Sequence, residues 1–425
     1  MKNIILSIGK VEQGLVTAAK RISAELGVGL QGIHLVDEKY KKTLDYRKDD
    51  TGFFEEIELD FDDTALLQET VKPFQEHILA VNCRDESAIQ DFAKIVPLLA
   101  GVATPNESSL RWATVKSLMR ERLREYNPEL VPHFSVIEKQ QISSIQKITE
   151  NMQFPLIVKP SGLNSSILVM KCEDHDELLA ALEKTFSVIE EIYERERGSG
   201  SPQVLIEEFI EGDMYSTDAY VSPDGKIWCL PPVRVITSHD VGLSGFYGYE
   251  FQLPTELNNE ELQALEKAAK QSVEALNLRS CTAHIELYNC NGIWKIIELG
   301  PRIGGHREDL YRESYGIDHY YNDLVSRIEG LNPVIPKEPK QYSICMDLYP
   351  EKEGVIESFN GLEEARKLST CVYAHAHADV GMPFYSAENG SPYAASAIFS
   401  GPNKKQVTDD AAQARQLIKI ITKPF

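Results

Sequence analysis

Two glutamates and an arginine could act together in the stretch HIELYNCNGIWKIIELGPRIGG near residue 300. Alternating apolar and polar residues on both sides of the Asn-Gly pair predict a β-hairpin, with Glu286 on its first strand and Glu298 on its second. Carboxylates on neighbouring strands can hold hard cations, which readily take phosphates as further ligands. Arg302 adds a planar, permanently charged group for carboxylate or phosphate oxygens. The stretch therefore predicts a metal-assisted phosphate site rather than a solvated surface hairpin.

This interpretation sets a geometric condition on the hairpin. To hold the same metal ions, the two glutamates must lie on one face and nearly opposite each other. Eleven residues separate them, so an unbulged two-residue turn at Asn291-Gly292 would pair Glu286 with Ile297 and turn Glu298 to the other face. The sequence therefore predicts a loop of three or five residues, or a bulge at Gly292.

Charged and small residues also mark two earlier strands. Lys159 closes the apolar run 155–159 and is followed by a loop of small, hydroxyl-rich residues, 160–166, whose backbone N–H groups could cover phosphates. A lysine at such a place is either an edge-strand charge or a phosphate ligand. Glu207 and Glu208 end another apolar strand, whose exposed backbone groups could bind an adenine ring.

The order and spacing of these features resemble the ATP-grasp superfamily of carboxylate–amine ligases, over most of the chain. The matching series is Lys116, Lys159 with its loop, residues 207–210, Glu286 with Glu298, and Arg302. Within the superfamily, the motif ELGPRIGG and the additional C-terminal segment are most similar to the L-amino-acid ligases that make dipeptides.

The resemblance implies a role for each matching residue. ATP would be bound by Lys116, Lys159, Ser165, Ser166, Glu207, Glu208, Phe209, Ile210 and Asp213. Mg²⁺, or Mn²⁺ in its place, would be held by Glu286 and Glu298, and Arg302 would stabilise an acyl phosphate and the intermediate that follows it. Substrates are expected near Arg234, His239, Gly304, Gly305, His306, Arg307 and Asp85, although helix capping explains Asp85 equally well.

Three positions depart from the family's pattern. Met214 stands where relatives commonly have a glutamate for the ribose, which leaves Asp213 as a substitute. Gly300 replaces an asparagine found after the second metal glutamate in many relatives, and Phe251 replaces a histidine of some dipeptide ligases. The ribose contact, one metal ligand and the choice of substrate are therefore open.

The implied function is an ATP-dependent ligase that activates an amino acid carboxylate as an acyl phosphate. It would join this group to an amine, first of all that of a second amino acid, with release of ADP and phosphate. Two alternatives remain: a carboxylating or purine-pathway ATP-grasp ligase, and an ATP-binding sensor with reduced catalysis. His375 and His377 resemble a metal pair, but their spacing of two merely places both on one face of a strand.

Composition limits the partners. The net charge of −21 over 425 residues argues against nucleic acid and anionic membranes, and no apolar run approaches the ~18 residues of a membrane span. Seven scattered cysteines without a C-x-x-C pair predict reduced thiols and a cytoplasmic protein, and the N-terminus reads as a strand rather than a signal peptide. Amino acids are the expected partners, and a homodimer is left open.

The order of the strands and helices that must position these residues predicts a mixed α/β fold, with α+β character in the ATP-binding part. Residues 1–105 alternate strand and helix as a doubly wound N-terminal domain. Residues 106–338 form the ATP-grasp domain, with a small lobe at about 140–211, a lid at about 237–250 and the metal hairpin at 280–300. Residues 339–425 form a C-terminal domain. One helix is expected over 107–124 and a final helix over 409–421.

Overall fold

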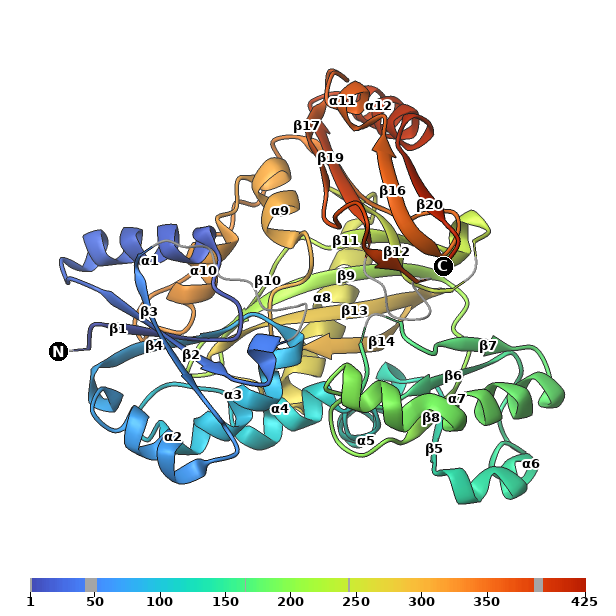
Figure 1. The fold of residues 1–425 in the computed structure, drawn as a ribbon, viewed down its shortest axis with the longest axis horizontal. Helices are drawn as coiled ribbons and strands as arrows, with labels where there is room; N and C mark the ends of the chain where they lie inside the picture. The colour runs from blue at the N-terminus through green and yellow to red at the C-terminus, as the bar shows by residue number, and fades with distance from the viewer. Residues whose placement is uncertain (1, 43–51, 165, 244, 386–392) are drawn as a thin grey trace.

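A computed structural model describes residues 2–42, 52–164, 166–243, 245–385 and 393–425 of the chain, so Ser165 lies outside the described residues. The described residues form four β-sheets with helices packed against them, which confirms the predicted mixed α/β class (Figure 1). No helix in the described ranges combines the length and the apolar character that crossing a membrane requires.

The N-terminal unit is built around a four-stranded parallel sheet in the order β3-β2-β1-β4. Its elements are β1 (Ile4–Ile8), α1 (Gln13–Leu26), β2 (Gln31–Asp37), β3 (Phe54–Leu59), α2 (Thr64–Val71), β4 (Ile78–Cys83) and α3 (Ile89–Ile95). Helix α1 covers one face together with α10 (His319–Val325), and α2 and α3 cover the other (Figure 1). The sequence pattern predicts this alternation but not β3 and α2.

The predicted helix over 107–124 is two helices, α4 (Glu107–Thr114) and α5 (Lys116–Tyr126). Val115 between them has extended backbone angles, φ −109° and ψ 103°. The break lets the Lys116 N–H donate to the carbonyl of Ser161 at 2.7 Å, so the start of α5 is tied to the small-residue loop.

The predicted small lobe contains an antiparallel sheet in the order β5-β8-β6-β7 (Figure 1). Its elements are β5 (Phe134–Ile137), α6 (Ile145–Ile148), β6 (Leu156–Pro160), β7 (Met170–Cys172), α7 (His175–Arg195) and β8 (Val204–Glu208). Helix α7 starts at Asp174, whose carboxylate accepts the N–H groups of residues 176 and 177. Its apolar face, including Leu178, Leu182 and Phe186, packs on the sheet.

The largest sheet has the order β14-β13-β9-β11-β12-β15-β19-β17, with β10 paired to β9. Its strands are β9 (Asp213–Val221), β10 (Ile227–Cys229), β11 (Val233–Thr237), β12 (Gly248–Leu253), β13 (Cys281–Cys290), β14 (Ile293–Gly300), β15 (Tyr342–Leu348), β17 (Cys371–Ala376) and β19 (Ala395–Gly401). Helix α8 (Asn259–Ala275) contributes to the core on one face. Because β12 pairs with β15, the sheet runs without interruption from the predicted ATP-grasp segment into the predicted C-terminal segment.

The hairpin of β13 and β14 places Glu286 directly opposite Glu298, as the metal site requires. The predicted cause is wrong, because the turn has only two residues, Asn291 and Gly292, both with positive φ. The bulge lies instead at Ile297, where the register shifts so that Leu287 pairs with residue 296. One extra residue in β14 thus brings both carboxylates to the same face.

The chain ends in a sheet of β16 (Gly354–Asn360), β18 (Pro383–Phe384) and β20 (Lys419–Lys423). Beside it lie α11 (Leu362–Ala365) and α12 (Lys404–Leu417). The predicted final helix over 409–421 is therefore wrong at its end. It stops at Leu417, because Ile418 is extended and the alternating residues that follow pair with β16.

Gly212 gives a test of the packing behind the hairpin. A Cβ at Gly212 would lie 2.1 Å from the carbonyl oxygen of Asn289, so neither backbone could stay in place. We expect Gly212→Ala to lower the free energy of unfolding by about 1–3 kcal/mol in urea titrations. Gly29→Ala is the control, because a Cβ there meets nothing within 4 Å, and its effect should stay within about 0.5 kcal/mol. Equal stabilities of the two variants would contradict the close approach.

Candidate active site

A buried network of charges joins the small lobe to the hairpin. Lys159 at the end of β6 lies with its Nζ 2.6 Å from Oε2 of Glu207 on β8. Arg120 of α5 pairs with the same carboxylate and also donates to the carbonyl of Ile297 at 2.8 Å. The guanidinium therefore binds the carbonyl of the bulge residue that sets the hairpin register. The side chains of Arg120, Glu207 and Lys159 are all at least nine-tenths buried.

Burial and charge shift the pKa values in this network in opposite ways. Burial lowers the pKa of Lys159 to about 8, and the nearby Arg120 acts in the same direction against the attraction of Glu207. Burial would raise the pKa of Glu207, but the charges of Arg120 and Lys159 prevail and lower it to about 2. The carboxylate is thus charged at neutral pH, and Lys159 loses its proton more easily than a lysine in water.

Lys116 connects the small-residue loop to the hairpin. Its Nζ lies 3.1 Å from Oε1 of Glu298 and also donates to the carbonyl of Leu163. A shallow pocket is lined by both charged side chains together with Glu86, Gly162, Asn164 and Arg197. The structure therefore brings three of the predicted site residues, Lys116, Glu286 and Glu298, to one face of the hairpin.

Behind Glu286 lies a row of buried acidic groups and histidines. His284 directs Nε2 to Glu286 at 3.3 Å and Nδ1 to Asp218 at 2.7 Å. Asp218 also accepts from His319 Nε2 at 2.7 Å and from the N–H of Gly304 at 3.0 Å. Asp218 therefore holds both the histidine behind the predicted metal ligand and the glycine after Arg302.

The charges in this row shift the pKa values of His284, Asp218 and Glu286. Burial lowers the pKa of His284, but the charge of Asp218 and the hydrogen bonds to Asp218 and Glu286 outweigh it, so the net shift is upward. Burial likewise opposes the charged forms of Asp218 and Glu286, yet His284 lowers the pKa of both carboxyl groups. A protonated ring between two carboxylates can donate at both nitrogens, which orients Glu286.

Arg302 faces the N-terminal unit. Its Nε donates to Oε2 of Glu86 at 2.7 Å, and its Nη1 donates to the carbonyl of Ile303 at 3.0 Å. The same Glu86 oxygen would lie 2.8 Å from a Cβ placed on Gly300. The carboxylate of Glu86 thus lies against Gly300, the position at which many relatives are expected to have an asparagine.

Residues after Arg302 contact the large sheet. The Arg307 Nη2 donates to Ser216 Oγ at 2.7 Å, and the guanidinium lies 4.7 Å from the ring centroid of Phe251. His306 has a left-handed backbone, φ 57°, and its ring contacts Phe251 and Tyr393. An imidazole therefore reaches Phe251, the position where some relatives carry a histidine, from the loop before α9 (Arg307–Tyr315).

Residues of the predicted lid pack over the end of β8. The ring of His239 stacks on Phe246 with 5.1 Å between centroids, and Phe209 contacts both rings at 6.0 Å. Lys171 lies 4.5 Å from the centre of the Phe209 ring. Phe209 and His239 are therefore neighbours at the end of β8, where an adenine ring is expected.

Other predicted site residues contact groups outside the cluster of Glu286, Glu298 and Arg302. The exposed Asp213 pairs with Arg234 at 2.6 Å, and Arg234 also donates to the carbonyls of residues 214 and 235. Glu208 accepts from the N–H of residue 153 at 3.1 Å. Asp85 caps the turn that follows it and accepts from Tyr40, so the capping interpretation accounts for its contacts. Ser166 and Ile210 are partly buried, and Gly305 has open space around its Cα.

Sequence reasoning missed Arg120, Ser216 and Asp218. An aspartate in the otherwise apolar end of the run 215–221 is the one available signal for Asp218. Among the described residues, His375 and His377 do not belong to a group of three metal-binding side chains. The first stacks on Tyr373 and the second contacts Ser396.

Asp218→Asn tests the row behind Glu286. The change removes the charge that raises the pKa of His284, so this pKa should fall in an NMR titration of the imidazole. The free energy of unfolding should drop by about 3 kcal/mol, since a buried partner is lost. The drop should be largest between about pH 4 and 6.5, because stabilisation by charged His284 is complete below its unfolded pKa and declines as pH rises through the raised folded value.

Asp213→Asn is the matched control, because that carboxylate forms an exposed pair with Arg234. Its effect should stay below about 1 kcal/mol. An unchanged His284 pKa in Asp218→Asn would show that Asp218 does not control the ring.

Comparison with known proteins identifies two segments. Residues 152–308 match the ATP-grasp domain family, and residues 347–423 match the L-amino acid ligase C-terminal domain 2. The solved structure of an L-amino acid ligase from Bacillus licheniformis superposes with a TM-score of 0.75 at 19% identity, covering 100% of both chains. The predicted ATP-grasp architecture is thereby confirmed.

Curated relatives are ligases as well. An alanine–anticapsin ligase of Bacillus amyloliquefaciens is 23% identical over 424 residues, 91% of this chain and 87% of that protein. A D-alanine–D-alanine ligase of Buchnera aphidicola subsp. Schizaphis graminum is 23% identical over 245 residues, 55% of this chain and 72% of that protein. Matches to three further D-alanine–D-alanine ligases span 37%, 61% and 49% of those proteins. The chain therefore carries an ATP-grasp domain and an L-amino acid ligase C-terminal domain.

Proposed function

We propose that this enzyme activates the carboxylate of one amino acid with ATP and joins it to the amine of a second, releasing ADP and phosphate. The observation that carries the proposal is the direct pairing of Glu286 with Glu298, with Lys116 at 3.1 Å from the second carboxylate. The match of residues 347–423 to an L-amino acid ligase domain favours amino acids over purine-pathway substrates.

The donor set fits Mg²⁺. Two carboxylates on one face supply the hard oxygen ligands that this ion prefers, and it commonly completes its shell with phosphate oxygens and water. Glu286 and Glu298 would hold the ion, which would neutralise charge on the transferring phosphoryl group when bound. Glu86, placed over Gly300, is a further carboxylate beside this face.

Cations of this chain would meet the phosphates. Lys116 reaches the small-residue loop from α5, and Lys159 on β6 directly precedes this loop, where ATP would enter between the lobes. A phosphate beside Lys159 would favour its charged form and so reverse the effect of burial on its pKa. The aromatic contacts of Phe209 with His239 and Phe246 would cover the adenine end and exclude water.

Arg302 would act on the acyl group. Its guanidinium already binds a carboxylate, that of Glu86, so the position is built for an anion and is pre-oriented from the loop after β14. An acyl phosphate and the tetrahedral intermediate carry negative charge that such a donor stabilises more than it stabilises the free substrate. We also infer a cytoplasmic location, which the seven free cysteines support.

The proposal predicts phosphate release from ATP that depends on added amino acids. Pairs of amino acids should be screened with a phosphate assay, and the product should be identified by mass spectrometry as a dipeptide. Glu298→Gln should lower the rate at least about 100-fold, because a neutral amide cannot balance the charge of Mg²⁺. Glu256→Gln is the control, since that carboxylate is exposed and pairs with Lys404. No amino acid dependence in any pair would refute the function.

A second prediction separates binding from chemistry at Arg302. Arg302→Ala should bind Mg-ATP with little change, while kcat for product formation falls by about 10²–10³-fold. Arg312→Ala, an exposed arginine on α9, serves as control. If Arg302→Ala instead weakened ATP binding and preserved kcat, the arginine would be a nucleotide ligand and the assignment wrong.

A further inference from the structure

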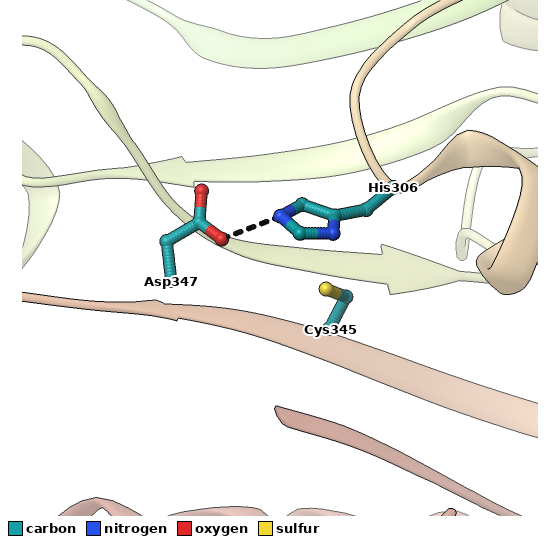
Figure 2. A group of neighbouring side chains, drawn as sticks. All are labelled: His306, Cys345 and Asp347. Carbon is teal, nitrogen blue, oxygen red and sulfur yellow. Dashed lines mark ion pairs between the residues drawn. The ribbon is translucent and has the colours of Figure 1, made fainter. Parts of the chain in front are cut away.

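Three side chains of metal-binding type meet beside the loop that follows Arg302. One ligand atom from each of His306, Cys345 and Asp347 lies within 4.8 Å of the others, and Figure 2 shows the three directed toward one another. Cys345 and Asp347 are two residues apart on β15, so they share one face of the strand. His306 comes from the residue before α9. The group thus joins strand β15 to residues 301–306, the loop after β14 near which substrates are expected and which is here called the predicted substrate loop.

The cluster is buried and poorly satisfied by hydrogen bonds. Cys345 is 0% exposed and Asp347 5%. The Nε2 of His306 lies 2.8 Å from Oδ1 of Asp347, yet neither atom makes a well-directed hydrogen bond among the described residues. Phe251 and Tyr393 pack against the His306 ring. Ionisable groups in such surroundings need a compensating charge or strong hydrogen bonds.

We propose that His306, Cys345 and Asp347 bind a divalent transition-metal ion, with Zn²⁺ as the best fit. Thiolate and imidazole ligands favour zinc over Mg²⁺, which takes oxygen ligands. One thiolate and one carboxylate balance the two charges of the ion, and the imidazole binds in its neutral form. The site is chemically distinct from the all-oxygen pair of Glu286 and Glu298.

The thiol of Cys345 and the imidazole of His306 must each lose a proton before they can bind a metal ion. Burial raises the pKa of the Cys345 thiol, and neighbouring Asp347 and Cys345 raise the pKa of His306 against the effect of burial. Metal binding would therefore displace protons from both groups, as in other thiolate–imidazole sites. Three protein ligands leave a fourth position for water or a substrate group. Because His306 directly follows Gly305, an ion here would fix the end of the predicted substrate loop.

Co²⁺ reports a thiolate ligand directly. The chelator-treated full-length protein should take up one Co²⁺ per chain and develop a near-ultraviolet sulfur-to-cobalt charge-transfer band. Cys345→Ser should abolish the band, whereas Cys281→Ser, an equally buried cysteine of the same sheet, should keep it. His306→Gln and Asp347→Asn should each weaken Co²⁺ binding by more than about tenfold.

Further outcomes decide the proposal independently of ligase activity. The band should persist in a Glu286→Gln/Glu298→Gln double variant, so failure of the proposed magnesium site leaves this test intact. Near-ultraviolet circular dichroism verifies that each variant is folded. If Cys345→Ser does not fold, the loss of Co²⁺ binding in His306→Gln and Asp347→Asn tests the site in its place. Absence of the band in the unmodified protein, or its persistence in folded Cys345→Ser, would overturn the metal site and leave a buried His306–Asp347 ion pair.

Discussion

The site depends on one extra residue in one strand. The bulge at Ile297 changes the register between β13 and β14, and without it Glu286 and Glu298 would lie on opposite faces of the sheet. Arg120 binds the carbonyl of this residue and the carboxylate of Glu207 at once. A single buried guanidinium therefore couples the hairpin register to the position of Lys159 on the neighbouring lobe. The same side chain thus links the hairpin that carries the predicted metal pair to the carboxylate that pairs with the predicted phosphate lysine.

Buried charge is tolerated here because it is paired in extended sets. Lys159, Glu207 and Arg120 form one set, and Glu286, His284, Asp218 and His319 form another. Each set restricts the conformations of the side chains that would contact ATP, metal or substrate. The chain has a net charge of −21, so its overall field repels phosphates. Lysine and arginine side chains are nevertheless gathered locally where phosphates are expected.

Sequence patterns predicted the strands that carry the site better than the contacts behind it. Apolar runs ending in Lys159 and Glu207, and the two halves of the hairpin, have strong periodicity and are strands in the structure. The bulge at Ile297 has no glycine or turn residue to mark it in the sequence, and the contact that accompanies it is a tertiary hydrogen bond from Arg120. The break at Val115 and the end of the last helix at Leu417 likewise depend on pairing with distant segments, Ser161 and β16. His306, predicted near substrate, and Cys345 with Asp347 become neighbours only through the packing of α9 on β15.

The pairing of β12 with β15 has a consequence for the evolution and engineering of this protein. A chain that ended before β15 would leave a full row of unpaired backbone N–H and C=O groups along β12. Such an open edge is a template for another strand, and molecules exposing it would associate edge to edge. The last part of the chain therefore protects the protein from aggregation, in addition to anything it contributes to the site. If the segment from β15 onward were exchanged between related ligases, the backbone pairing of β12 with β15 would have to be preserved before the exchange could alter substrate choice.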